Sequence, residues 1–171
     1  YQTQHDLVSA VPHLYYQHVE RPIILDKCRS WTMPANLDML QRYITGTPKV
    51  IVLERPLHEI VESFVRLRKA NGWTKDFKRD LLVKGSEPIM RSLDGVKFAK
   101  QSKSDWFLFI TYEELTTDTQ GVLDRIYTFC EWAPFQHDLE HIIDMHPEDD
   151  DVYGLKGQHE VRPTISPRIP A

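Results

Sequence analysis

Arg55 and Ser63 are two polar residues whose types and spacing could do chemistry in this chain. The stretch KVIVLERPLHEIVESF predicts a buried strand that ends at Arg55 and a helix whose apolar side carries Ser63 together with Ile60 and Leu67. A planar guanidinium binds phosphate oxygens with two parallel hydrogen bonds. A phosphate lying along this helix would therefore contact Arg55 at one end and Ser63 at the other. An equally weighted alternative is a serine that only bonds its own helix backbone.

Polar groups also follow two other apolar runs. Lys27 and Arg29 come after residues 22–26, and Tyr112 comes after residues 106–110. The carboxyl ends of parallel strands meet at one edge of a sheet, and the helix N-termini beside them favour anions. We therefore expect a site for an anion that also carries a base. For any single cation, simple solvation is an equally good interpretation.

The elements that must position these groups alternate between strand and helix. Three unbroken apolar runs, residues 23–26, 50–53 and 107–110, predict adjacent parallel strands covered on both faces. The expected fold is therefore α/β, a three-layer sandwich around a central parallel sheet. Helices are expected at residues 2–20 with a break or kink at Pro12, 32–44, 56–71, most of 73–103, and 119–132, before an extended tail over 152–171.

Composition limits the class of protein. With 171 residues, of which 41% are apolar, the chain fits one domain covering residues 1–171. Its net charge of −4 argues against a general nucleic-acid binder, but it leaves room for a local anion site. No apolar run is long enough to span a bilayer. Cys28 and Cys130 form no disulfide framework, which favours a reducing compartment such as the cytoplasm.

The Arg55-to-Ser63 spacing on a strand-turn-helix resembles the 3′-phosphate-binding motif of sulfotransferases, although Pro56 follows the arginine directly. ITYEELTTDTQGVLDRIYTFCEW resembles the segment of that family whose tyrosine, here Tyr112, lies near the adenine. YGLKGQHEVRP resembles the late basic loop that covers the 3′-phosphate, here with Lys156, Gly157 and Arg162. The resemblance extends over residues 22–162.

The resemblance implies a P-loop-NTPase-like sulfotransferase fold and an enzyme that transfers a sulfuryl group from 3′-phosphoadenosine 5′-phosphosulfate. The expected product is adenosine 3′,5′-bisphosphate. The acceptor would be a hydroxyl or amine of a carbohydrate, small molecule or protein side chain, and no metal is implied. Because ILDKCRSW resembles a loop that carries active-site groups in the family, Lys27 is the candidate catalytic residue. Arg29 would contact donor or acceptor, or be solvated.

One part of the family pattern is not visible. Members begin with a strand and a Gly/Ser/Thr-rich loop that binds the 5′-phosphosulfate, but no glycine occurs here before Gly46. That loop either precedes Tyr1 or is lacking. The alternative function is therefore a non-catalytic domain that binds nucleotide phosphates. A P-loop kinase is less favoured, because the sequence has no GxxxxGK[ST] run.

Two further clusters of side chains carry residue types that could form sites. His137 and His141 are expected on one helix face, but no cysteine or fixed carboxylate completes a zinc set, so no metal site is predicted. The stretch RLRKANGWTKDFKR carries six cations and two aromatic rings. We interpret it as a solvated helix end, in preference to a surface for an anionic acceptor.

Overall fold

Two parallel strands form the centre of the computed structural model, which describes residues 2–84, 89–102, 104–145 and 147–165. Strand β1 is Val50–Glu54 and strand β2 is Phe107–Thr111. They pair in register from Val50 opposite Phe107 to Glu54 opposite Thr111. Both strands therefore end at the same edge, as the apolar runs predicted.

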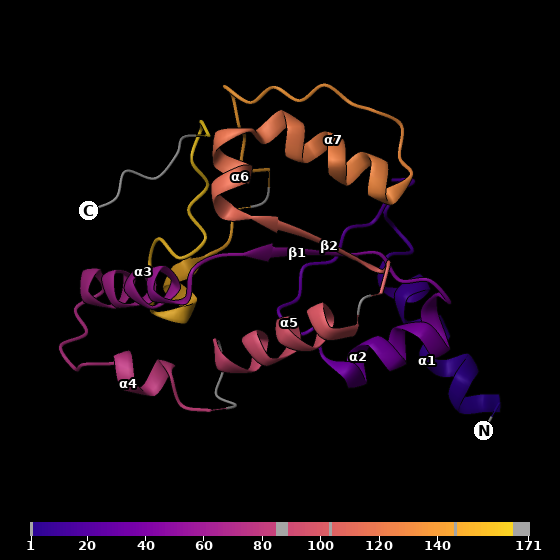
Figure 1. Cartoon of the computed structure of the whole chain (residues 1–171), viewed down its shortest axis with the longest axis horizontal. Coiled ribbons are helices and arrows are strands. Elements are labelled where there is room, and N and C mark those ends of the chain that lie inside the picture. The colour runs from indigo at the N-terminus through magenta and orange to yellow at the C-terminus, as the bar shows by residue number, and fades with distance from the viewer. Residues whose placement is uncertain (1, 85–88, 103, 146, 166–171) are drawn as a thin grey trace.

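Helices cover both faces of this sheet (Figure 1). Helices α6 (Tyr112–Thr117) and α7 (Thr119–Cys130) lie on one side. Helices α2 (Pro34–Met39) and α5 (Met90–Ser102) lie on the other. The arrangement confirms the expected α/β fold with a parallel sheet.

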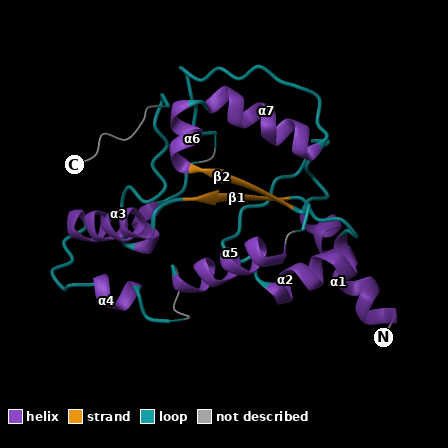
Figure 2. Cartoon of the chain, viewed as in Figure 1, coloured by secondary structure: helices purple, strands orange, loops and turns teal. Residues whose placement is uncertain are grey.

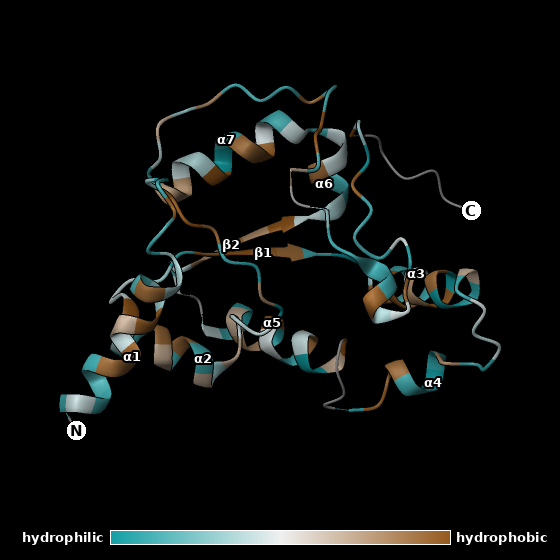
Figure 3. Cartoon of the chain, turned by 180° about the vertical axis from the view of Figure 1, so that it is seen from behind, coloured by the Kyte–Doolittle hydropathy of each residue, from teal (hydrophilic) through white to brown (hydrophobic). Residues whose placement is uncertain are grey.

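The core explains why these helices pack where they do. Val52 and Phe107 form a buried cluster with Leu37 of α2 and Ala99 of α5. The strands are among the most hydrophobic parts of the chain in Figure 3, as expected for a sheet buried between helices. Gly95 allows α5 to approach closely, since a Cβ there would lie 2.5 Å from the Thr32 hydroxyl.

Helix α3 (Leu57–Ala70) continues the chain beyond β1, and the short helix α4 (Lys78–Leu81) packs beside it. A second core cluster holds them, with Val61, Leu81 and Ile89 buried together. This cluster fixes one side of α3, while the side that carries Ser63 is only half-buried. Residues 85–88 and 103 of the expected helical region lie outside the described residues.

Helix α1 (Gln2–Tyr15) contains Pro12 without ending there, and it stops before the predicted residue 20. It packs against the π-helix η1 (Leu40–Ile44), where the Ser9 hydroxyl donates to the Tyr43 carbonyl at 2.7 Å. No helix in the described ranges is long and apolar enough to cross a membrane.

The prediction of a strand at residues 23–26 is wrong. Figure 2 draws the connection between α1 and α2 as loop, and Ile23 and Leu25 are 43% and 73% exposed. An extended segment becomes a strand only where a neighbour completes its backbone hydrogen bonds. The only strands among the described residues are β1 and β2, and they pair with each other.

The C-terminal region is mostly irregular, as predicted, apart from the short 3-10 helix η2 (Asp150–Tyr153). The imidazole Nδ1 of His159 lies 2.6 Å from an Asp150 carboxylate oxygen, and the His159 N–H donates to the same carboxylate. These hydrogen bonds lower the pKa of Asp150 from its ordinary value. They close the loop that carries Lys156 and Gly157. Residues 166–171 of the predicted tail lie outside the described residues.

Candidate functional site

Arg55 and Tyr112 meet at the carboxyl edge of the sheet. Each is the residue directly after its strand, and the last paired residues are Glu54 and Thr111. The guanidinium carbon of Arg55 lies 4.9 Å from the centroid of the Tyr112 ring. This distance is typical of a cation–π contact. The structure therefore joins two of the groups that the sequence predicted to share a site.

The Arg55 guanidinium is largely buried, with 17% of its side chain exposed. Its Nε donates to Glu59 Oε2 at 2.9 Å. Its terminal nitrogen Nη2 is buried and has no hydrogen-bond partner among the residues that the structure describes. Leaving a buried donor unpaired costs about 1–3 kcal/mol, and more for a charged group. Such a nitrogen is well suited to an anionic acceptor.

A capping box fixes the position of Tyr112. The Thr111 hydroxyl accepts from the Glu114 N–H at 3.1 Å, and the Glu114 carboxylate accepts from the Thr111 N–H at 2.8 Å. Arg125 donates to the same carboxylate and to the Phe109 carbonyl of β2. The Thr111 N–H, then its hydroxyl and Arg125, lower the pKa of Glu114. Helix α6 therefore begins immediately at the strand end and holds the tyrosine there.

Ser63 lies one helical turn beyond Glu59 on the same face of α3. Its side chain is half-buried, and its hydroxyl makes no hydrogen bond to any described residue. The alternative interpretation, a serine bonded to its own helix backbone, is therefore not what the structure shows. Arg55 lies just before α3, and Glu59 and Ser63 follow it at intervals of four residues. Pro56 supplies no side-chain cap, which leaves first-turn N–H groups of α3 available for an anion.

The late basic loop reaches the same helix at its other end. The Lys156 N–H donates to the Asn71 side chain at 2.8 Å, and the Asn71 amide donates to the Lys156 carbonyl at 3.0 Å. Gly157 has a φ of 83°, which favours glycine. Asn71 follows the last turn of α3, about 12 Å along the axis from Ser63 at 1.5 Å per residue. Lys156, Gly157 and Arg162 are exposed.

Lys27 and Arg29 are not joined to the strand-end residues by any hydrogen bond or ion pair in the described structure. Both side chains are exposed, and neither makes a hydrogen bond or ion pair with a described residue. Nearby, Asp26 is bonded by Trp31 and Tyr16, at 2.7 and 3.2 Å. The segment is therefore held at Asp26, and its two cations extend into solvent.

The two clusters weighed as alternatives also have structural explanations. The expected helix face at residues 137–141 is wrong, because this stretch is irregular. His137 bonds the Tyr127 hydroxyl at 2.9 Å, and His141 bonds Asp138. In the described ranges no group of three or more His, Cys, Asp or Glu residues could hold a metal ion.

Arg68, in the basic stretch, is less solvated than expected. Its guanidinium carbon lies 4.7 Å from the centroid of the Phe77 ring and 5.4 Å from that of Trp73, and its Nε is buried. The stretch therefore includes a cation that packs on aromatic rings and is not only a solvated helix end.

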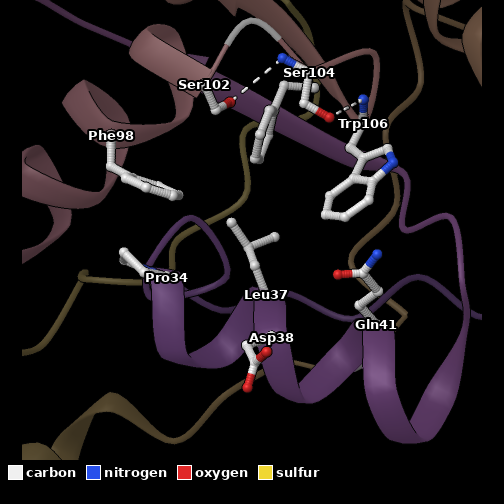
Figure 4. A pocket seen from close by; sticks show the side chains of 9 residues that line it. Pro34, Leu37, Asp38, Gln41, Phe98, Ser102, Ser104 and Trp106 are labelled. Atoms are coloured by element: carbon white, nitrogen blue, oxygen red, sulfur yellow. Dashed lines mark hydrogen bonds between the residues drawn. The ribbon is translucent and has the colours of Figure 1, made fainter.

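A cavity of about 200 Å³ lies at the opposite end of the sheet, between α2, α5 and the start of β2. Figure 4 shows Leu37, Phe98 and Trp106 around it, with Asp38 and Gln41 on the helical side. Ser102 and Ser104 accept backbone hydrogen bonds from the β2 connection. Its lining includes the core side chains Leu37 and Phe107, and it lies at the edge where the strands begin, so it is separate from the Arg55 site.

Sequence reasoning missed Glu59, the direct partner of Arg55. The signal was present, because an arginine and a glutamate four residues apart are placed to pair at a helix start. It also missed the network around Glu114, although the sequence TYEE carries the spacing of a capping box.

Comparison with known proteins assigns the family. The model described as "Sulfotransferase family" matches residues 2–137. The chain is 36% identical over 94 residues to human "Sulfotransferase 2B1", an alignment that covers 51% of this chain and 26% of that protein. The chain thus spans about a quarter of the length of this relative. No solved structure matches it. With the family match extending over more than half of its residues, the chain belongs to the sulfotransferase family.

Proposed function

We propose that this chain binds the 3′-phosphate side of 3′-phosphoadenosine 5′-phosphosulfate and belongs to an enzyme that transfers its sulfuryl group to a hydroxyl or amine. The observation that carries the proposal is the Arg55 guanidinium at the strand ends. It is largely buried, it lies over the Tyr112 ring, and its terminal nitrogen Nη2 has no hydrogen-bond partner among the described residues. Membership of the sulfotransferase family supports the donor chemistry.

The residues present fit a 3′-phosphonucleoside. Arg55 would hold the 3′-phosphate through its terminal nitrogens, and Ser63 would donate its free hydroxyl to the same group. Tyr112 would offer the adenine the ring face that Arg55 does not cover. The proposal includes Lys156, Gly157 and Arg162, because the loop that carries Lys156 and Gly157 is anchored to α3, the helix of Ser63.

The chemistry asked of this chain is positioning and charge stabilisation. The donor would supply the sulfuryl group and its leaving phosphate, and no metal is required for that role. Arg55 and Ser63 would fix the distant end of the nucleotide and so orient the reacting end. We propose Lys27 as the cation that stabilises negative charge near the transferring group, since its ammonium is exposed and unpaired.

The partners are therefore the nucleotide donor and a hydroxyl- or amine-bearing acceptor. Candidates for the acceptor are a carbohydrate, a small molecule or a protein side chain. The alternative, a domain that binds the nucleotide without transferring a group, would use the same Arg55 and Ser63 contacts. The two functions differ in turnover and not in nucleotide affinity.

The test is transfer of radioactive sulfur from the donor to a panel of sugars, phenols, sterols, amines and tyrosine peptides. The protein is assayed at full length, with Arg55→Ala beside the wild type. We expect label on at least one acceptor class and a large loss in the variant. Donor binding without transfer to any class would favour the non-catalytic alternative. Absence of donor binding would contradict the proposed function itself.

A further inference from the structure

We propose that Glu59 is a positioning residue that directs the terminal nitrogens of Arg55 toward the 3′-phosphate. The inference rests on the proposed function and adds a residue that the sequence pattern did not single out. Glu59 would not touch the nucleotide. It would act by holding one edge of the guanidinium, so that another edge faces the ligand.

The geometry of the guanidinium divides its donors into separate edges. The Nε–H and one N–H of Nη2 share the side edge, and the other N–H of Nη2 forms, with one N–H of Nη1, an end fork that matches two phosphate oxygens. Glu59 Oε2 accepts from Nε at 2.9 Å. Nη2, a member of the fork, is buried and unpartnered. The carboxylate therefore bonds the guanidinium while leaving a terminal donor available.

Two other groups complete the support. The Arg55 guanidinium carbon lies over the Tyr112 ring, 4.9 Å from its centroid. The neighbouring carboxylate, Glu54, is paired with Lys100 at 2.7 Å and so does not compete for Arg55. Because Glu59 bonds its Nε and the Tyr112 ring lies beside it, the Arg55 guanidinium has little freedom to turn. A pre-oriented fork loses less conformational entropy when it binds a phosphate.

The position of Glu59 also suits its charge. It lies in the first turn of α3, where the positive end of the helix dipole stabilises a carboxylate. Its side chain is 37% exposed, against 17% for Arg55, so the glutamate sits at the rim and the arginine inside. This arrangement favours a permanent support over a carboxylate that occupies the phosphate position and must leave.

The test compares calorimetric affinities for adenosine 3′,5′-bisphosphate and adenosine 5′-phosphate across variants of the full-length protein. Glu59→Ala should weaken bisphosphate binding roughly tenfold and leave 5′-phosphate binding unchanged, because only the 3′-phosphate uses the fork. Glu59→Gln keeps an oxygen that accepts from Nε, and should stay within about threefold of wild type. Glu62→Ala is the matched control, an exposed glutamate on the same helix, and should change neither affinity.

Each other outcome has a distinct meaning. Tighter bisphosphate binding by Glu59→Ala would show that the Glu59 carboxylate competes with the 3′-phosphate for Arg55, and this would overturn the proposal. Equal loss for both nucleotides would show general damage to α3 and overturn it as well. If Glu59→Ala fails to fold, Glu59→Gln still decides, since a loss as large as that of Arg55→Ala contradicts support through a hydrogen bond. A wild type that does not distinguish the two nucleotides would instead refute the proposed function.

Discussion

Residues 22–29 and residues 50–55 look alike in sequence but differ in the structure. Each is a short apolar run followed by a cation. The second forms β1, with Val52 only 5% exposed, and it ends in a guanidinium held on two sides. The first is loop, with Leu25 73% exposed and two cations that form no hydrogen bond or ion pair with a described residue.

The two regions differ because of a neighbouring strand and not because of the apolar sequence itself. β1 has β2 beside it, and their ladder also aligns Arg55 with Tyr112. Residues 22–26 have no strand beside them in the described chain. A cation thus becomes part of a site when pairing fixes the backbone that carries it. Affinity for adenosine 3′,5′-bisphosphate tests this contrast between the two regions.

The largest loss is expected for Arg55→Ala. Removing a charged hydrogen-bonding partner costs on the order of 1.5–3 kcal/mol, or roughly ten- to a hundredfold in affinity. Arg55→Lys should recover only part, because an ammonium keeps the charge without the fork. Isothermal calorimetry measures both. Lys69→Ala, which removes an exposed cation from the last turn of α3, serves as the control and should bind normally. Full recovery by lysine would mean that charge alone explains the site.

A smaller loss is expected for Tyr112→Leu, which removes the ring beside Arg55. A cation–π contact contributes about 0.5–2 kcal/mol, so the affinity should fall roughly two- to thirtyfold. Tyr112→Phe retains the ring and should stay close to wild type. Competition with a fluorescent nucleotide provides the measurement. An effect of Tyr112→Phe as large as that of Tyr112→Leu would assign the role to the hydroxyl and not to the ring face.

Ser63→Ala should have a smaller effect than Arg55→Ala. A neutral hydrogen bond contributes about 0.5–1.5 kcal/mol, which corresponds to roughly two- to tenfold in affinity. Ser63→Thr keeps the hydroxyl and should restore most of the binding. Calorimetry at one temperature shows which of the variants Ser63→Ala and Arg55→Ala loses more affinity. If Ser63→Ala weakens binding and Arg55→Ala does not, the phosphate lies elsewhere.

The least change in affinity is expected for Lys27→Ala, because Lys27 forms no hydrogen bond or ion pair with a described residue of the Arg55 site. Its proposed role is at the transferring group, so the transfer rate should fall on the order of a hundredfold while bisphosphate affinity stays within about twofold. The two readouts are single-turnover transfer and calorimetry. Arg29→Ala, assayed in parallel, separates the contribution of the other cation in the segment. A large affinity loss for Lys27→Ala would show that the two regions form one site.

The sequence predicted the features that depend on local pattern and on strand pairing. The apolar runs predicted the parallel strands β1 and β2 and the helix that carries Ser63. Because parallel strands end at the same edge of a sheet, the runs also predicted that Arg55 and Tyr112 lie close together. It failed at residues 22–26, because apolar character does not say whether a partner strand is present. It also failed at residues 137–141, where an apparent helical spacing lies in an irregular segment.

Contacts between side chains were harder to predict than elements. The bond from Arg55 to Glu59 and the packing of Arg68 on Phe77 depend on rotamers and burial, which a spacing alone leaves open. The attachment of Lys156 to Asn71 joins residues 85 positions apart through backbone and amide groups. A contact between residues so far apart does not appear in the sequence as a repeating pattern of residue types.

The central claim is that Arg55 and Ser63 bind a 3′-phosphate, and nucleotide selectivity tests it most directly. Calorimetry should compare adenosine 3′,5′-bisphosphate with adenosine 5′-phosphate and with adenosine 2′,5′-bisphosphate, which has the same charge but a displaced phosphate. We expect the 3′,5′-bisphosphate to bind roughly tenfold or more tightly than either, and the advantage to disappear in Arg55→Ala. Equal affinity for all three nucleotides in the wild type would contradict the account.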